Sequence, residues 1–144
     1  MNADILNDLA ARVEAGEGVN GADRELHCLI FQAIGAPVPF QFANKFIALT
    51  FVEKEQAYFV ELGDGMRIRY EPPSYTSSID AAMTLVPEGL RFEVTTTGYR
   101  PGATVCGNIL TGVHEGSYAA TPALALTAAA LRAHAAIAKE NEGG

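Results

Sequence analysis

The chain has little of what marks secreted or membrane-spanning proteins. Its 144 residues include two cysteines, Cys28 and Cys106, which lie far apart and outside any CxxC pattern. This usage predicts buried thiols in a reducing compartment rather than a disulfide framework. No apolar run reaches the roughly 18 residues that a bilayer-spanning helix needs, and the acidic, amphipathic N-terminus does not resemble a signal peptide. We therefore expect a cytoplasmic protein without membrane contact.

Positive charge is also scarce. Ten Lys and Arg residues stand against 17 Asp and Glu, which gives a formal net charge of −7 and a pI near 4.8. A uniformly acidic surface repels phosphate backbones, so duplex nucleic acid is not an expected partner. The argument does not exclude a small anionic ligand, because a few local cations suffice to bind one.

Motifs for nucleophilic catalysis, for a P-loop and for a paired-histidine metal site are missing. The sequence has no GxSxG elbow, no GxxxxGK[ST] loop, and no HxxxH or HExxH pair. We therefore expect structural or surface roles for His27, His114 and His134, with no metal and no cofactor. An enzyme would require His27 or His114 to meet Cys28 or Cys106 in a pocket, which the sequence does not indicate. We expect that the protein is not an enzyme.

The order of elements predicts the fold class. The length and a hydrophobic fraction of 49% indicate one globular domain over residues 1–144 rather than a disordered chain. Periodicity predicts helices over 4–15, 20–34 and 78–86, and strands over 46–53, 56–62, 66–70, 90–97 and 104–113. A last helix begins at Thr121 and Pro122 and is followed by a frayed tail over 140–144. The order ααβββαββα predicts an α+β domain with a mainly antiparallel sheet.

Local patterns also predict caps and buried faces. Ser77 and Asp80 resemble a capping box for the third helix, Asn20 is placed to cap the second, and Thr121 to cap the last. Residues 114–117 are expected to form a turn. The expected buried stripes are Ile5, Leu6, Leu9 and Val13 in the first helix, Leu26, Leu29, Ile30, Ala33 and Ile34 in the second, Ile79, Ala82, Met83 and Val86 in the third, and Leu124, Ala128, Leu131, Ala135 and Ala138 in the last.

Two segments carry a family resemblance. They are YTSSIDAAMTLVPEGLRF over 75–92 and the C-terminal TPALALTAAALRAHAAIAKE. Together with the opening DLAARVEAG and the helix DRELHCLIF, they resemble the phage ABA sandwich domain family over nearly the whole chain. The resemblance implies a sheet covered by helices on both faces, in a phage or prophage protein of the bacterial cytoplasm. The shared motifs concern packing and capping, so the resemblance carries no catalytic residue with it.

The phage resemblance leads to two hypotheses about function. Phages carry compact acidic α+β proteins that sequester cyclic nucleotide or cyclic ADP-ribose signals of bacterial immunity. The first hypothesis is therefore a non-enzymatic sponge for a small anionic nucleotide, expected to be a homo-oligomer because such pockets often lie between subunits. The alternative is a structural or protein-interaction module, which would bind a host or phage protein through the alanine-rich last helix or the acidic surface.

Two groups of residues are candidates for ligand binding. Tyr75, Thr76, Ser77 and Ser78 place an aromatic ring and three hydroxyls at a helix N-terminus, where N–H groups bind anions. The alternative is that these hydroxyls only cap the helix.

Cationic candidates make up the second group. Arg67 and Arg69 share one strand face and could form a planar fork for phosphate. Arg100, next to Tyr99 in a turn, and Arg132 on the last helix are further candidates. The alternative for the arginine pair is a solvated sheet face with ion pairs to Glu61, Glu71 or Glu93.

Overall fold

A computed structural model describes residues 2–17, 24–35, 46–55, 57–63, 65–70, 72–96, 100–107 and 112–143. The elements in these ranges are α1 (Ala3–Glu14), α2 (Arg24–Ile34), β1 (Phe46–Val52), a 3-10 turn (Glu53–Glu55), β2 (Ala57–Leu62), β3 (Arg67–Tyr70), α3 (Ile79–Met83), β4 (Arg91–Thr95), β5 (Gly102–Cys106), β6 (His114–Tyr118) and α4 (Pro122–Gly143). Strands β1-β2-β3 form one antiparallel sheet and β4-β5-β6 another. The predicted α+β class with antiparallel strands is confirmed.

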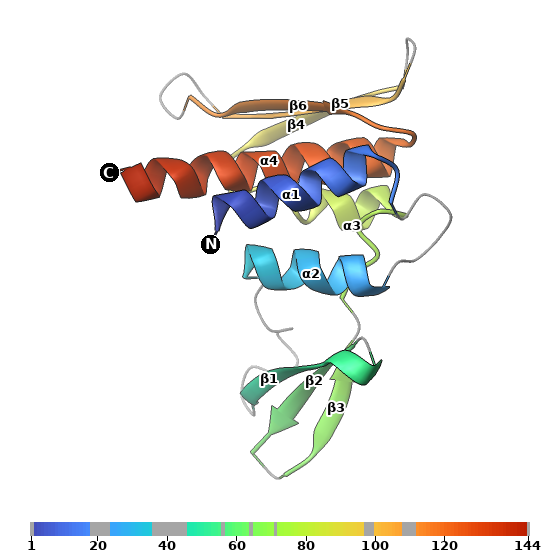
Figure 1. Ribbon diagram of the computed structural model, residues 1–144, viewed down its shortest axis with the longest axis vertical. Helices are drawn as coiled ribbons and strands as arrows, with labels where there is room; N and C mark the ends of the chain where they lie inside the picture. The colour runs from blue at the N-terminus through green and yellow to red at the C-terminus, as the bar shows by residue number, and fades with distance from the viewer. Residues whose placement is uncertain are drawn as a thin grey trace.

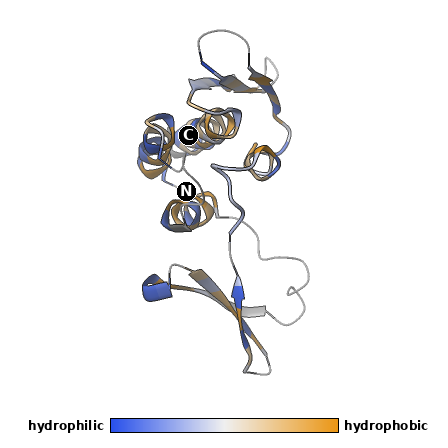
Figure 2. Cartoon of the chain, turned by 90° about the vertical axis from the view of Figure 1, so that its right-hand side faces the viewer, coloured by the Kyte–Doolittle hydropathy of each residue, from blue (hydrophilic) through white to orange (hydrophobic). Residues whose placement is uncertain are grey.

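The helices occupy the middle of the molecule, between the two sheets (Figure 1). The β4-β5-β6 sheet lies on α4, whereas the β1-β2-β3 sheet lies beyond α2 at the other end (Figure 1). A view turned by 90° shows the helices nearly end-on in this middle layer (Figure 2). The arrangement therefore differs from the expected single sheet with helices on both faces.

Helix α4 explains the central position of the helices. Every residue from Ala123 to Leu131 is buried, and a helix that is apolar on all sides needs neighbours all around it. Helices α1 and α3 and the β4-β5-β6 sheet provide these neighbours. The predicted stripe is confirmed, since its five members are 0–6% exposed: Leu124, Ala128, Leu131, Ala135 and Ala138.

Local signals set most helix ends. The Thr121 hydroxyl accepts a hydrogen bond from the Leu124 N–H at 3.2 Å, as predicted for the N-cap of α4. Gly16 and Gly35 adopt positive φ angles of 100° and 63° just after α1 and α2. The expected frayed tail is wrong, because α4 continues to Gly143. The predicted Asn20 cap lies outside the described residues.

The buried stripes of α1 and α2 match the prediction in part. Leu6, Leu9 and Val13 are buried in α1, but Ile5 is exposed because it lies at the edge of the stripe. In α2, Leu26 and Ile30 are buried. The other three predicted members are half-buried and pack against the core: Leu29, Ala33 and Ile34.

Helix α3 is shorter than predicted. The Ser78 hydroxyl accepts a hydrogen bond from the Ala81 N–H at 3.3 Å, so Ser78 is the N-cap and the assignment to Ser77 is wrong. Because α3 ends at Met83, the chain turns and buries Leu85 in the core. Ile79 and Met83 were expected to be buried, but they are 37% and 42% exposed.

The predicted strand over 104–113 is correct only for residues 104–106, which belong to β5. Strand β5 ends at Cys106, and the Gly107 N–H donates to the Val113 carbonyl at 2.9 Å as the chain folds back. Residues 114–117 form β6 rather than a turn. The sequence HEGSY has little intrinsic strand preference. Its strand conformation therefore comes from pairing with β5.

Candidate functional site

A groove of about 650 Å³ lies between the start of α3, strand β4 and the first turn of α4. This volume is within the range of small-molecule sites. Phe92, Val94 and Thr96 alternate along β4 and form one wall. The other walls are formed by Thr76, Ser77, Ile79, Thr121, Pro122 and Ala123. These nine lining residues include no charged side chain, so the groove is apolar with hydroxyl groups.

The groove exposes large apolar side chains from two of its walls. Phe92 of β4 is 38% exposed, and Ile79, the first residue of α3, is 37% exposed. A single exposed apolar side chain is common on protein surfaces, but several that lie together mark an interaction site. Because Phe92 and Ile79 line the same groove, the groove is a candidate binding site.

A buried polar pair fixes the wall at Thr76. His27 on α2 and Thr76 are 3% and 2% exposed. His27 Nε2 lies 2.8 Å from Thr76 Oγ1 and accepts the Thr76 backbone N–H at 3.4 Å. This contact holds the segment before α3 against α2.

Tyr75 extends this buried support. Its ring meets the His27 ring edge-on, with centroids 6.1 Å apart. The Thr127 hydroxyl of α4 donates to the Tyr75 carbonyl at 2.8 Å. Burial, and to a smaller extent the nearby Tyr70 and Tyr58, raises the pKa of the Tyr75 phenol. The phenol is therefore neutral and serves the core.

The hydroxyl-rich segment predicted as a site is divided between different roles. Thr76 and Ser77 line the groove. Ser78 caps α3, as the self-capping alternative proposed. Tyr75 is not among the residues that line the groove.

The arginine pair lies on β3 of the sheet beyond α2 (Figure 1), and neither arginine lines the groove. Arg67 Nε is 3.6 Å from Glu61 Oε1, and its guanidinium lies 5.0 Å from the centroid of the Phe59 ring. The ion pair with Glu61 was the alternative to a phosphate fork. Arg69 is the cross-strand partner of Phe59, and Glu71 is outside the described residues.

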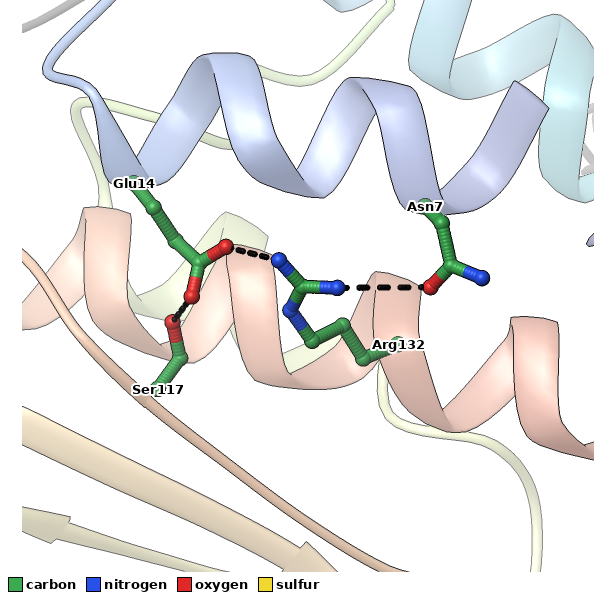
Figure 3. A network of polar contacts seen from close by, with 4 residues as sticks. All are labelled: Asn7, Glu14, Ser117 and Arg132. Carbon is green, nitrogen blue, oxygen red and sulfur yellow. Dashed lines mark hydrogen bonds and ion pairs between the residues drawn. The ribbon is translucent and has the colours of Figure 1, made fainter. Parts of the chain in front are cut away.

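Arg132 holds secondary structure elements together (Figure 3). Its guanidinium forms an ion pair with Glu14 of α1 and donates to Asn7 Oδ1 at 3.4 Å. The Ser117 hydroxyl of β6 donates to the other oxygen of Glu14 at 2.6 Å. This network joins α4, α1 and β6 and does not reach the groove.

Arg100 is exposed, just before β5, and is not one of the residues that line the groove. Its predicted neighbour Tyr99 lies outside the described residues. The structure therefore does not bring the four predicted arginines together, nor does it place them with Thr76 and Ser77.

The histidines and cysteines do not line the groove either. Cys106 of β5 is the direct cross-strand partner of His114 of β6. His134 Nε2 lies 2.7 Å from the Leu85 carbonyl oxygen. Burial lowers the pKa of His134 more than this hydrogen bond raises it. Neither Cys28 nor Cys106 forms a disulfide, and Cys28 is buried.

Two further properties concern the part of the chain that the structure describes. There, no cluster of three or more His, Cys, Asp and Glu side chains is arranged to hold a metal ion. None of the helices described combines the length and the apolar character needed to cross a membrane.

Sequence reasoning missed most of the groove. Phe92, Val94 and Thr96 were read only as one face of a half-buried strand, and Pro122 and Ala123 only as the start of a helix. Alternation along β4 identifies the face, but it does not say that part of this face stays exposed. No local sequence signal indicates this, because the exposure of Phe92 and Ile79 depends on how the elements pack.

The chain was compared with family models, with curated proteins and with solved structures, and none of them matches. The family resemblance therefore rests on the sequence motifs alone.

Proposed function

We propose that the protein is a non-catalytic binding protein that holds a small ligand in the groove between α3, β4 and α4. The observation that carries the proposal is the groove itself, with about 650 Å³ of uncharged, mainly apolar space lined by four hydroxyl side chains. Such a site binds through shape and a few polar contacts. It needs no nucleophile and no metal.

The lining favours a flat ligand with polar edges. Phe92 provides an aromatic surface, and Thr76, Ser77 and Thr96 provide hydroxyl groups. Thr121 caps the 22-residue helix α4 and Ala123 lies in its first turn, and the N-terminal end of such a helix attracts negative charge. A nucleotide suits these features if its base occupies the apolar part and its phosphate lies toward α4.

The proposed role is sequestration. In line with the phage resemblance, the protein acts in the bacterial cytoplasm as a sponge that withholds an anionic nucleotide signal of anti-phage immunity. The absence of arginines from the lining means that affinity comes from burial, hydroxyl contacts and α4. The predicted pair Arg67 and Arg69 is not needed for this role.

Thermal unfolding in the presence of cyclic dinucleotides, cyclic trinucleotides and cyclic ADP-ribose isomers tests the proposal. A ligand at about 100 times its Kd should stabilise the folded state by about 2.7 kcal/mol. For a domain of this size, the expected rise in Tm is roughly 5–12 °C. The compound should be recovered intact after denaturation, because a sponge does not turn it over. An unchanged Tm with every compound of the panel, or recovery of a cleaved product, would contradict the proposal.

Two neighbouring threonines provide a matched pair of variants. Thr96→Trp fills the groove and should abolish the stabilisation, whereas Thr95→Trp places the same ring on the outer face of β4 and should retain it. The double variant Arg67→Ala, Arg69→Ala should also retain it. Loss of ligand binding in the arginine variant alone would place the site on the β1-β2-β3 sheet instead.

A second candidate function is a protein-interaction module or a homo-oligomer. The observation that favours it is the exposure of three large apolar side chains around α3 and β4, namely Ile79, Met83 and Phe92. Met83 does not line the groove, so Met83→Glu should disrupt a protein interface without filling the ligand site. Light scattering should then show a smaller particle than for the parent protein. A monomeric parent protein that captures no partner would count against this function.

A further inference from the structure

We propose that the groove recognises a hydrogen-bond donor on its ligand through Thr76, and that His27 is the positioning residue that makes Thr76 an acceptor. The inference rests on the proposed function, since it assumes that the groove holds a small ligand. It names the chemistry that this ligand must present at one wall.

The backbone of Thr76 determines the tautomer of His27. The Thr76 N–H donates to His27 Nε2 at 3.4 Å. A backbone N–H is only a donor, so Nε2 must carry a lone pair. In a neutral imidazole one ring nitrogen is a donor and the other an acceptor, which places the proton of His27 on Nδ1.

The tautomer in turn determines the orientation of the Thr76 hydroxyl. Oγ1 lies 2.8 Å from the same Nε2. Because Nε2 accepts, the hydroxyl proton of Thr76 points to His27. A threonine hydroxyl has one proton and two lone pairs. Thr76 therefore has its side-chain proton and its backbone N–H committed to His27, and only lone pairs remain for a ligand.

The buried surroundings maintain this polarity. His27 and Thr76 are 3% and 2% exposed, so little water is present to take the place of either partner. The neighbouring Tyr75 is fixed by the edge-on contact with His27 and by the Thr127 hydroxyl on its carbonyl. Rotating the Thr76 hydroxyl toward the groove would leave the buried Nε2 with one partner fewer, which is unfavourable.

The chemical class of the ligand follows. A ring N–H, an amino group or a hydroxyl can donate to Thr76, as on an aminopurine or an indole. A carbonyl or phosphate oxygen at this wall would face the lone pairs of Thr76 Oγ1 and would be repelled. The phosphate of a nucleotide must therefore lie elsewhere, and the amino or N–H edge of its base should face Thr76.

Indole and benzofuran are a suitable pair of probes, because they have nearly the same shape and differ by a ring N–H against a ring oxygen. Their Kd values are measured by titration followed in protein NMR spectra. Indole should bind about tenfold more tightly than benzofuran, equivalent to about 1.4 kcal/mol for one hydrogen bond. Thr76→Ser keeps the hydroxyl and should keep this preference. Thr76→Val keeps the shape and should bind the two probes equally.

A second measurement needs no ligand. Nitrogen-15 NMR of the free protein should show His27 protonated at Nδ1 and unprotonated at Nε2, and a protonated Nε2 would overturn the inference. If both probes shift groove residues with equal Kd in the parent protein, the inference fails while the proposed function stands. If neither probe binds, the inference fails, while the proposed function is decided by the nucleotide panel.

Discussion

Arg132 gives the sharpest test of how the structure assigns roles to cationic residues. The sequence made Arg132 a candidate for ligand binding because it is one of few cations. The structure places it in a network with Glu14, Asn7 and Ser117 (Figure 3). We predict that Arg132→Ala lowers the free energy of unfolding and leaves ligand binding in the groove unchanged. Arg132 does not line the groove, so no contact with the ligand is lost.

The magnitude follows from exposure and from the number of partners. Hydrogen bonds to charged groups contribute about 1.5–3 kcal/mol, and breaking a fully buried ion pair costs about 3–5 kcal/mol. The side chains of Arg132 and Glu14 are 29% and 27% exposed, so water can replace part of the contact. Glu14 also keeps the Ser117 hydroxyl as a partner. We therefore expect a loss of about 1.5–2 kcal/mol and a fall in Tm of roughly 4–8 °C.

Urea denaturation measures this change. A double-mutant cycle with Glu14→Gln should give a coupling energy of about 1 kcal/mol, because the two side chains share one contact. Arg100→Ala is the control, since Arg100 is exposed, and it should change stability by less than about 0.5 kcal/mol. An Arg132→Ala protein as stable as the control, or strictly additive changes in the cycle, would refute the reasoning.

Three further predictions concern a cap, a buried histidine and the core. Ser78→Ala should cost about 1 kcal/mol by urea denaturation and Ser77→Ala less than about 0.5 kcal/mol, because Ser78 is the residue that caps α3; equal losses would contradict this assignment. Burial lowers the pKa of His134 below its usual 6.5, so the unfolded chain binds the proton more readily and stability should fall as the pH drops below about 6.5. His134→Gln should flatten this fall, and an unchanged pH profile would exclude the mechanism. Leu131→Ala in the centre of α4 should cost about 2.7–5 kcal/mol, and a loss below about 1 kcal/mol would mean that Leu131 is not tightly packed.

The features that the sequence predicted well are local. Thr121 and Pro122 mark the start of α4 because a hydroxyl cap and a missing N–H act within one helical turn. The apolar stripe of α4 is correct for a similar reason, since helical spacing places Leu124 and Leu131 on one face. Strands β1, β2 and β3 also match within one or two residues, because β-branched and aromatic residues dominate them and polar turns separate them.

The features that it missed depend on distant parts of the chain. Residues 114–118 form β6 only because β5 offers a pairing edge, and their own sequence does not predict a strand. The periodicity of Ile79 and Met83 predicts a buried face. It does not show that α3 ends at Met83, or that Leu85 is buried in the core while Ile79 and Met83 stay exposed. Ile79 lines the groove because it is exposed, so the site could not be located before the fold was known.

The arginine candidates show the same limit. Alternation correctly places Arg67 and Arg69 on one strand face, since Arg67 pairs with Glu61 and Arg69 with Phe59 across β2 and β3. It does not show that the β1-β2-β3 sheet lies beyond α2, whereas the groove is formed by α3, β4 and α4 (Figure 1). Charge and hydroxyl patterns that look like parts of one site thus belong to different parts of the fold.

The most direct test of the groove as the ligand site is chemical-shift mapping with the compound that stabilises the protein most. In nitrogen-15 spectra, the account predicts shifts of the amides of residues 76–79, 92–96, 121 and 123 on titration, with those of 67–69 unchanged. The Thr96→Trp protein should show no such shifts at the same concentrations. Shifts centred on Arg67 and Arg69, or undiminished shifts in the Thr96→Trp protein, would contradict the account.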